Sequence, residues 1–73
     1  MYRLHRHDRG SSRTHVDFST AHEAQKALDV LLDEQRTRGC VVSVRQVLGL
    51  SQWDSYDQDG LVSRFWLEVK QRS

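Results

Sequence analysis

The sequence predicts a small α+β domain in which a single helix packs on one face of a four- to five-stranded antiparallel sheet, in the element order ββαβββ. Three observations predict this architecture. Residues 20–38 carry a helical pattern with a start and a stop signal, residues 2–18 alternate like a hairpin, and residues 40–69 are rich in β-branched and aromatic side chains. A chain of 73 residues removes only about 60% of its unfolded surface from water. We therefore expect one domain, residues 1–73, with little room for a deep pocket.

The first two predicted strands form a hairpin. Apolar residues alternate with polar ones at the two-residue period of a half-buried strand, with Tyr2 and Leu4 on one side and Val16 and Phe18 on the other. Between them, residues 8–12 read DRGSS, which is turn chemistry.

The predicted helix begins at a capping box. The Thr20 hydroxyl can accept a hydrogen bond from the amide of Glu23, and the Glu23 side chain can reach back to Thr20. Gly39 can adopt the left-handed conformation that ends a helix. The apolar residues that recur at helical spacing on one face are Ala21, Ala24, Ala27, Leu28, Leu31 and Leu32. That face is expected to cover the sheet.

Three strands are predicted after Gly39. Residues 40–48 are rich in Val, residues 48–50 offer a turn, and residues 53–56 can pair back. Residues 57–60, DQDG, supply the turn of a second hairpin. The last strand is expected to direct Leu61, Phe65, Leu67 and Val69 inward, and Arg64, Trp66, Glu68 and Lys70 to the other face.

A helical alternative for the C-terminal half stays open. Residues 43–46, SVRQ, also form a capping box, and Leu61, Val62, Phe65, Trp66 and Val69 also share one helical face. The alternative fold is an N-terminal hairpin followed by a three-helix, helix-turn-helix-like half. Its recognition helix would lie within residues 51–59, which are acidic, whereas contact with DNA phosphates requires positive charge.

The composition is that of an ordinary globular protein. Hydrophobic residues make up 37% and charged residues 29%, and the chain has neither a low-complexity tract nor an internal repeat, which argues against disorder. No apolar run reaches the length of a signal peptide or a membrane span, so we expect a cytoplasmic protein without a membrane partner. Cys40 is the single cysteine and is expected to pack as a small apolar residue.

The candidate metal and catalytic motifs are weak. His5, His7 and His15 can gather on the first hairpin, but the chain lacks the Cys/His pairs that mark structural zinc. A calcium loop that starts at Ser55 would place Trp66 where a bidentate Glu is needed. No nucleophile lies beside a base, and no glycine-rich loop could hold a phosphate. We therefore expect no catalytic residue, no cofactor and no metal ligand.

The charges are unevenly distributed, although the net charge is only +1. Arginines crowd the first hairpin, whereas Asp54, Asp57 and Asp59 cluster in one acidic segment. The aromatic residues of the C-terminal half exceed what one helix can cover, and Trp, Tyr and Arg dominate the energetics of interfaces. The candidate partner-binding residues are Arg3, Arg6, Arg9, Arg13, Arg45, Trp53, Tyr56, Arg64 and Trp66. A core position for one of the two tryptophans is the alternative.

In architecture, the chain resembles small phage-encoded anti-CRISPR proteins, in particular type I-F inhibitors built as one helix on an antiparallel sheet. The resemblance spans nearly the whole chain. It rests on the basic first hairpin, the helix that starts at Thr20, the glycine and Val-containing strand after it, the Gly49-Leu50 turn, and Tyr56 shortly before Asp59-Gly60. It implies a stoichiometric inhibitor that occludes the DNA-binding surface of a CRISPR surveillance complex in the host cytoplasm. Because this chain has few lysines and an acidic segment at residues 54–59, no single contact residue is carried over.

Two functions therefore stay open. The first is a non-enzymatic binding protein, a phage anti-defence inhibitor whose partner is a bacterial protein complex. The second is a small DNA- or RNA-binding transcriptional regulator, with nucleic acid held by arginines of the first hairpin together with Arg45 and Arg64. A homodimer formed through Trp66 is compatible with either function.

Overall fold

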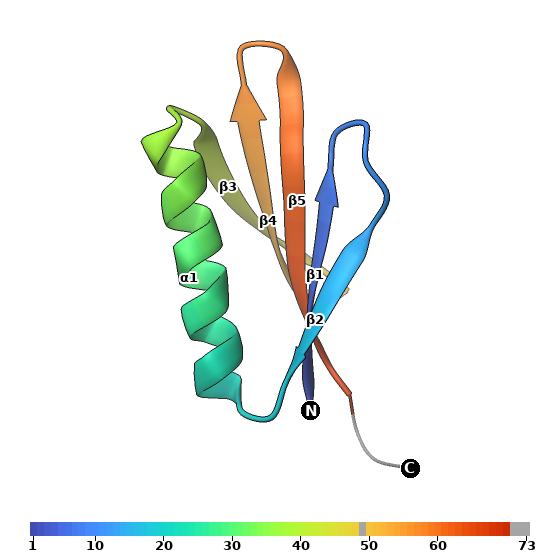
Figure 1. The fold of residues 1–73 in the computed structure, drawn as a ribbon. Coiled ribbons are helices and arrows are strands. Elements are labelled where there is room, and N and C mark those ends of the chain that lie inside the picture. Colours follow the sequence, from blue (N-terminus) through green and yellow to red (C-terminus); the bar gives the residue numbers. More distant parts are fainter. Residues whose placement is uncertain (49, 71–73) are drawn as a thin grey trace.

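The computed structural model describes residues 1–48 and 50–70 of the chain. Five strands form one sheet in the order β2-β1-β5-β4-β3, in which every neighbouring pair is antiparallel, and one helix covers one face (Figure 1). The elements are β1 (Tyr2–Asp8), β2 (Thr14–Phe18), α1 (Ala21–Thr37), β3 (Val41–Val47), β4 (Leu50–Asp57) and β5 (Gly60–Val69). This is the predicted α+β fold with the order ββαβββ. In the described residues, no helix is long and apolar enough to cross a membrane.

The helical alternative for the C-terminal half is wrong. After α1, the described residues form strands joined by turns, and β4 pairs with both β3 and β5. The residues of β5 fit a helical period and also the two-residue period of a strand, and pairing with the neighbouring strands of the sheet stabilises the strand. The turn predicted at residues 48–50 includes Gly49, which lies outside the described residues.

Helix α1 begins and ends at the predicted signals. Thr20 is the N-cap, and its hydroxyl oxygen accepts a hydrogen bond of 3.2 Å from the amide of Glu23. At the other end, Gly39 has a φ of 84° and donates its N–H to the carbonyl of Arg36 at 2.9 Å. The left-handed glycine turns the chain out of the helix and into β3.

Strand β5 occupies the middle of the sheet, between β1 and β4. It is the longest strand, with 10 residues, and it pairs with β1, the first strand of the chain (Figure 1). Lys70 donates its N–H to the carbonyl of Met1 at 2.8 Å, and Arg9 donates its N–H to Val62 at 2.7 Å. The first and last strands therefore pair with each other inside the sheet, while β2 and β3 form its two edges.

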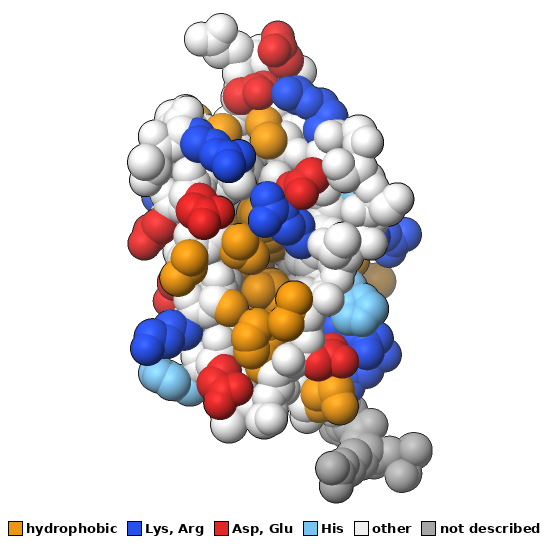
Figure 2. Space-filling view, viewed as in Figure 1, with side chains coloured by type: hydrophobic (Ala, Val, Ile, Leu, Met, Phe, Trp, Pro, Cys, Tyr) orange, Lys and Arg blue, Asp and Glu red, His pale blue; other side chains and the backbone are white. Residues whose placement is uncertain are grey.

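The core lies between α1 and the sheet. Leu28 and Leu32 of α1 pack against Leu4 of β1 and Phe65 of β5, and all four side chains are buried. Seen from one side, hydrophobic side chains gather in the middle of the molecule, with charged side chains of both signs around them (Figure 2). Burial of this apolar surface is the main source of stability in so small a domain.

The inward positions predicted for β5 are only partly confirmed. Phe65 is fully buried and Leu67 packs against the core, but Leu61 lies beside a register shift and is not among the core residues. Val69 is 59% exposed. It pairs with Tyr2 of β1 beyond the last residue pair of β4 and β5, so among the described residues no β4 residue pairs with it.

The core becomes polar beneath the C-terminal half of α1. Gln35 is buried, and its side-chain carbonyl accepts a hydrogen bond of 3.0 Å from the hydroxyl of Ser55. The hydroxyl of Ser63, also buried, donates to the carboxylate of Asp8. The side-chain nitrogen of Gln35 has no hydrogen-bond partner within the described part of the chain. Buried polar groups of this kind require specific partners, so they orient α1 on the sheet.

Candidate functional site

The sheet face opposite α1 carries most of the predicted binding residues. On β5, Phe65 points into the core, so its neighbours Arg64 and Trp66 point to the other side. The strand register extends this face across the sheet. We call it the open face; its members are Arg3, His5 and His7 of β1, His15 and Asp17 of β2, Arg45 of β3, Gln52 and Asp54 of β4, and Arg64, Trp66 and Glu68 of β5.

Trp66 contacts two side chains that come from the β1–β2 side of the sheet. The His5 ring stacks on it with a centroid separation of 4.7 Å and an interplanar angle of 5°. The Arg13 guanidinium lies 5.9 Å from the centre of its ring, within reach of a cation–π interaction. His5 also meets the Glu68 carboxylate at 2.9 Å, and this hydrogen bond lowers the pKa of Glu68. The stacking and cation–π contacts therefore restrain the indole ring.

A buried carboxylate organises the other half of the open face. Asp54 is only 1% exposed, although it lies on the face without the helix. It accepts hydrogen bonds from Arg64 Nε at 3.0 Å, from Gln52 Nε2 at 3.1 Å and from the Tyr56 hydroxyl at 3.3 Å. Arg45 Nε lies 3.5 Å from the same carboxylate. Four side chains from three strands thus converge on Asp54 and cover it.

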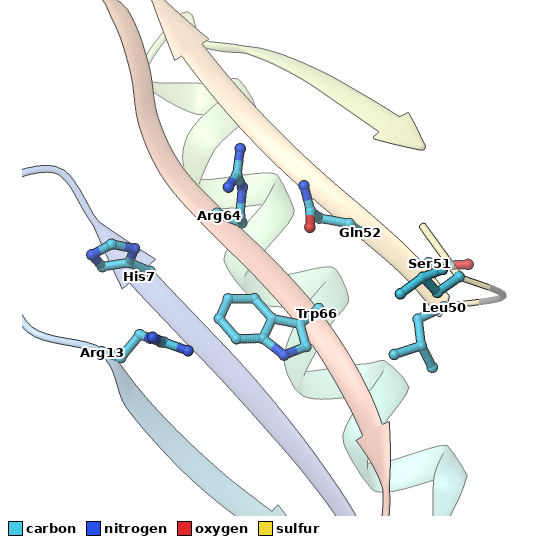
Figure 3. Close-up of a pocket in the computed structure, with 8 residues that line it drawn as sticks. His7, Arg13, Leu50, Ser51, Gln52, Arg64 and Trp66 are labelled. Carbon is cyan, nitrogen blue, oxygen red and sulfur yellow. The ribbon is translucent and has the colours of Figure 1, made fainter. Parts of the chain in front are cut away.

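A hollow of about 390 Å³ lies between these two clusters. Its lining residues are His7, Arg13, Leu48, Leu50, Ser51, Gln52, Arg64 and Trp66. Figure 3 shows His7 of β1 and Arg13, which precedes β2, on one side of Trp66, with Gln52, Ser51 and Leu50 of β4 on the other. The Arg13 guanidinium therefore lies on one side of the hollow and the Leu50 side chain on the other, a combination that fits an acidic group next to an apolar one.

The charges of the open face are largely paired. Arg3 makes two hydrogen bonds to Asp17, at 2.7 Å and 3.1 Å, and they lower the pKa of that carboxyl. Arg64 and Arg45 share Asp54. For Arg13, the described residues offer no carboxylate within 4.0 Å. Arg13 therefore places a positive charge at the hollow that no carboxylate of the described residues pairs within 4.0 Å.

The structure brings five of the nine predicted residues together. Arg13 lies beside Trp66, and Arg45, Tyr56 and Arg64 lie around Asp54. Arg3 lies on the same face, nearer the β2 edge.

Three predicted residues lie elsewhere. Trp53 neighbours Phe65 in the strand register and packs against the core on the helix side. Arg6 also lies on the helix side, 5.7 Å over the Phe65 ring, with its Nε 2.9 Å from Asp8. Arg9 pairs with Asp57 at 3.1 Å, where the turns of the two hairpins meet.

Sequence reasoning missed the centre of the site. The charge pattern groups Asp54 with Asp57 and Asp59 in one acidic segment, whereas Asp54 is a strand residue directly opposite Arg64. His5 belongs to a weak metal motif in the sequence, whereas in the sheet it pairs with Trp66 and stacks on its ring. The available signal was the two-residue period: Asp54 and Gln52 share one face of β4, as His5 and His7 share one face of β1. Within the described residues, no group of three or more His, Cys, Asp or Glu side chains is placed to hold a metal ion.

Comparisons with models of protein families, with curated proteins and with solved structures found no match for the chain.

Proposed function

We propose that this protein is a non-enzymatic binding protein that docks on its partner through the open face. The observation that carries the proposal is the fixed array of aromatic and arginine side chains around Trp66 and Asp54. Side chains already held in one conformation lose little entropy on binding, and Trp, Tyr and Arg contribute most of the energy of protein interfaces. The hollow beside Trp66 can bind a side chain of the partner.

The partner we propose is a bacterial protein complex, and a CRISPR surveillance complex is the first candidate. The support is architectural, since the element order ββαβββ and the single helix on an antiparallel sheet agree with the architecture of the type I-F inhibitors that the chain resembles. In this role, the chain would act in the host bacterial cytoplasm by covering the surface that otherwise binds nucleic acid. The positive charge at Arg13 requires that the partner contribute an acidic side chain to the contact.

A purified type I-F surveillance complex tests this proposal directly. We expect the wild-type chain to co-elute with the complex in gel filtration and to reduce its binding of target DNA. Arg13→Glu reverses the charge at the hollow and should weaken binding by a factor of at least about ten, as expected when like charges are brought together at an interface. Lys26→Glu makes the same type of change on an exposed residue of α1 and should have no effect.

Two results would contradict the proposal. A chain that does not co-elute with the complex excludes this partner. Equal loss of binding in Arg13→Glu and Lys26→Glu would exclude the open face as the docking surface.

One observation favours nucleic acid as a second candidate partner. The positive charge of Arg13 lies beside an aromatic ring, and single-stranded nucleic acid is bound by this combination. Fluorescence anisotropy with labelled single-stranded and duplex DNA tests it. If nucleic acid binds to this face, a plot of the logarithm of the binding constant against the logarithm of the salt concentration should have a slope of about −0.9 for each duplex phosphate neutralised. In Arg13→Gln the slope should correspond to about one phosphate fewer. Absence of binding at low salt would leave the protein partner as the remaining proposal.

A further inference from the structure

Strand β3 is an edge of the sheet that lacks the usual protection against pairing. It forms one ladder, with β4, so the backbone groups on its other side have no strand partner among the described residues. Natural edge strands are shielded by lysine, proline, a bulge or a short length. Strand β3 has seven residues, contains neither Lys nor Pro, and keeps an unbroken register with β4.

The side chains of β3 add an apolar surface to this free edge. Val41 is 68% exposed and Val44 is 57% exposed, and they lie on opposite faces of the strand. Arg45 is the single charged residue of the strand, and its guanidinium lies 3.5 Å from Asp54 of its own sheet. The charge that could repel a second strand is thus compensated by a carboxylate.

We propose that β3 pairs with β3 of a second copy of this chain, in an antiparallel arrangement with the two-fold axis through Val44. Val44 is the midpoint of the strand, so this register pairs all seven residues. It sets Val44 against Val44 of the second copy and places Arg45 opposite Ser43, so like charges do not face each other. The two sheets then form one continuous sheet of ten strands, five from each copy.

The sequence of β3 itself selects a second copy as the occupant. Antiparallel pairing of a strand with itself is isologous, so each position meets its mirror position: the central valine meets itself, and the single charged residue meets a serine. The other edge differs in length: β2 has only five residues, against seven in β3. This pairing through β3 leaves the open face free, so it does not depend on the proposed function.

Oligomeric state, measured by sedimentation velocity over a range of concentrations, tests the proposal. We expect the wild-type chain to reach twice its mass of 8.6 kDa as the concentration rises. Val44→Lys places two like charges across the two-fold axis and should give a monomer at every concentration. Val16→Lys is the matched control, because Val16 is 58% exposed on the other edge strand, against 57% for Val44, and this variant should still dimerise.

A cysteine variant tests the register and does not depend on how Val44→Lys folds. In a Cys40→Ser background, Val44→Cys brings two thiols together across the axis, at the Cα separation of about 4.5–5.5 Å that a disulfide accepts. Mild oxidation should convert this variant to a covalent dimer, whereas Val16→Cys should remain a monomer on a non-reducing gel. The proposal is overturned if the wild type stays monomeric, if the two cysteine variants cross-link equally, or if Trp66→Ala abolishes the dimer and Val44→Lys does not.

Discussion

At the scale of single residues, Asp54 decides the character of the open face. A carboxylate that is buried without partners is costly, but Asp54 accepts hydrogen bonds from Arg64, Gln52 and Tyr56. Each of these interactions also restrains the donor side chain. One acidic residue therefore converts flexible side chains of the sheet into an ordered surface.

Removing this negative charge should destabilise the protein. Asp54→Asn keeps the volume of the side chain but leaves Arg64 without its charged acceptor, and we expect a loss of about 2 kcal/mol in the free energy of unfolding, the cost of losing a hydrogen bond to a charged group. Urea unfolding followed by circular dichroism measures it. Asp59→Asn makes the same substitution at an exposed turn residue and should change stability by less than about 0.5 kcal/mol. Equal stabilities for the two variants would refute the central role of Asp54.

At the scale of elements, α1 shows how local signals set the limits of a helix. The Thr20 cap satisfies the amide of Glu23, and Gly39 supplies the positive φ that ends the helix. Both signals act over a few residues, which is why the start and the end of α1 could be predicted. The apolar face of α1 then places Leu28 and Leu32 on the sheet.

Loss of the cap should weaken the whole domain, because the helix forms one side of the core. We expect Thr20→Ala to reduce the free energy of unfolding by about 1 kcal/mol, since it leaves the amide of Glu23 without its acceptor. Ser19→Ala, one residue earlier in the chain, should have little effect. Chemical denaturation of the two variants distinguishes them, and a cost shared equally by both would show that the Thr20 hydroxyl does not cap the helix.

At the scale of the whole molecule, ion pairs and hydrogen bonds connect segments that are distant in the sequence. Arg9, in the β1–β2 turn, forms an ion pair with Asp57 at the end of β4. The carboxylate of Asp8 in β1 accepts a hydrogen bond from the hydroxyl of Ser63 in β5. Burial acts to raise the pKa of Asp8, but the hydrogen bonds from Ser63 and Arg6 outweigh it, and the pKa is lowered from its ordinary value of 3.8. The pKa of Asp57 is lowered in the same way. The largest cause is the hydrogen bond from the backbone amide of Asp59, and the second is the hydrogen bond from the Arg9 side chain.

These lowered pKa values predict loss of stability in acid. The unfolded chain takes up protons at the ordinary carboxyl values of 3.8 for Asp and 4.5 for Glu, whereas the folded chain takes them up only at lower pH. The stabilisation is therefore fully present above these values and is lost as the pH falls through the folded-state pKa values. Thermal unfolding from neutral pH downwards should show a falling midpoint.

The variant Asp8→Asn isolates one of these carboxyl groups. It should be less stable than the wild type at neutral pH, and the difference should narrow in acid, where the wild-type carboxyl is itself protonated. A difference that stays constant or widens on acidification would contradict the assignment.

The fold was more predictable from the sequence than the candidate site was. The hairpin and the capped helix carried local signals, and the strand pattern after Gly39 was stronger than its helical alternative. The binding residues were chosen by type, and type alone does not fix the face of a sheet. Trp53 and Trp66 are both tryptophans on neighbouring strands, yet one packs against the core and the other lies on the open face.

The sequence by itself determined which segments became strands and which became the helix, because caps, turns and hydrophobic periods act between residues close in the chain. Only the tertiary structure decided that β5 lies between β1 and β4 and that Asp54 lies beneath Arg64. The physical reason is that strand order and register depend on pairing between distant segments, and a slip of one residue exchanges the two faces of a strand. The open face is a product of that pairing.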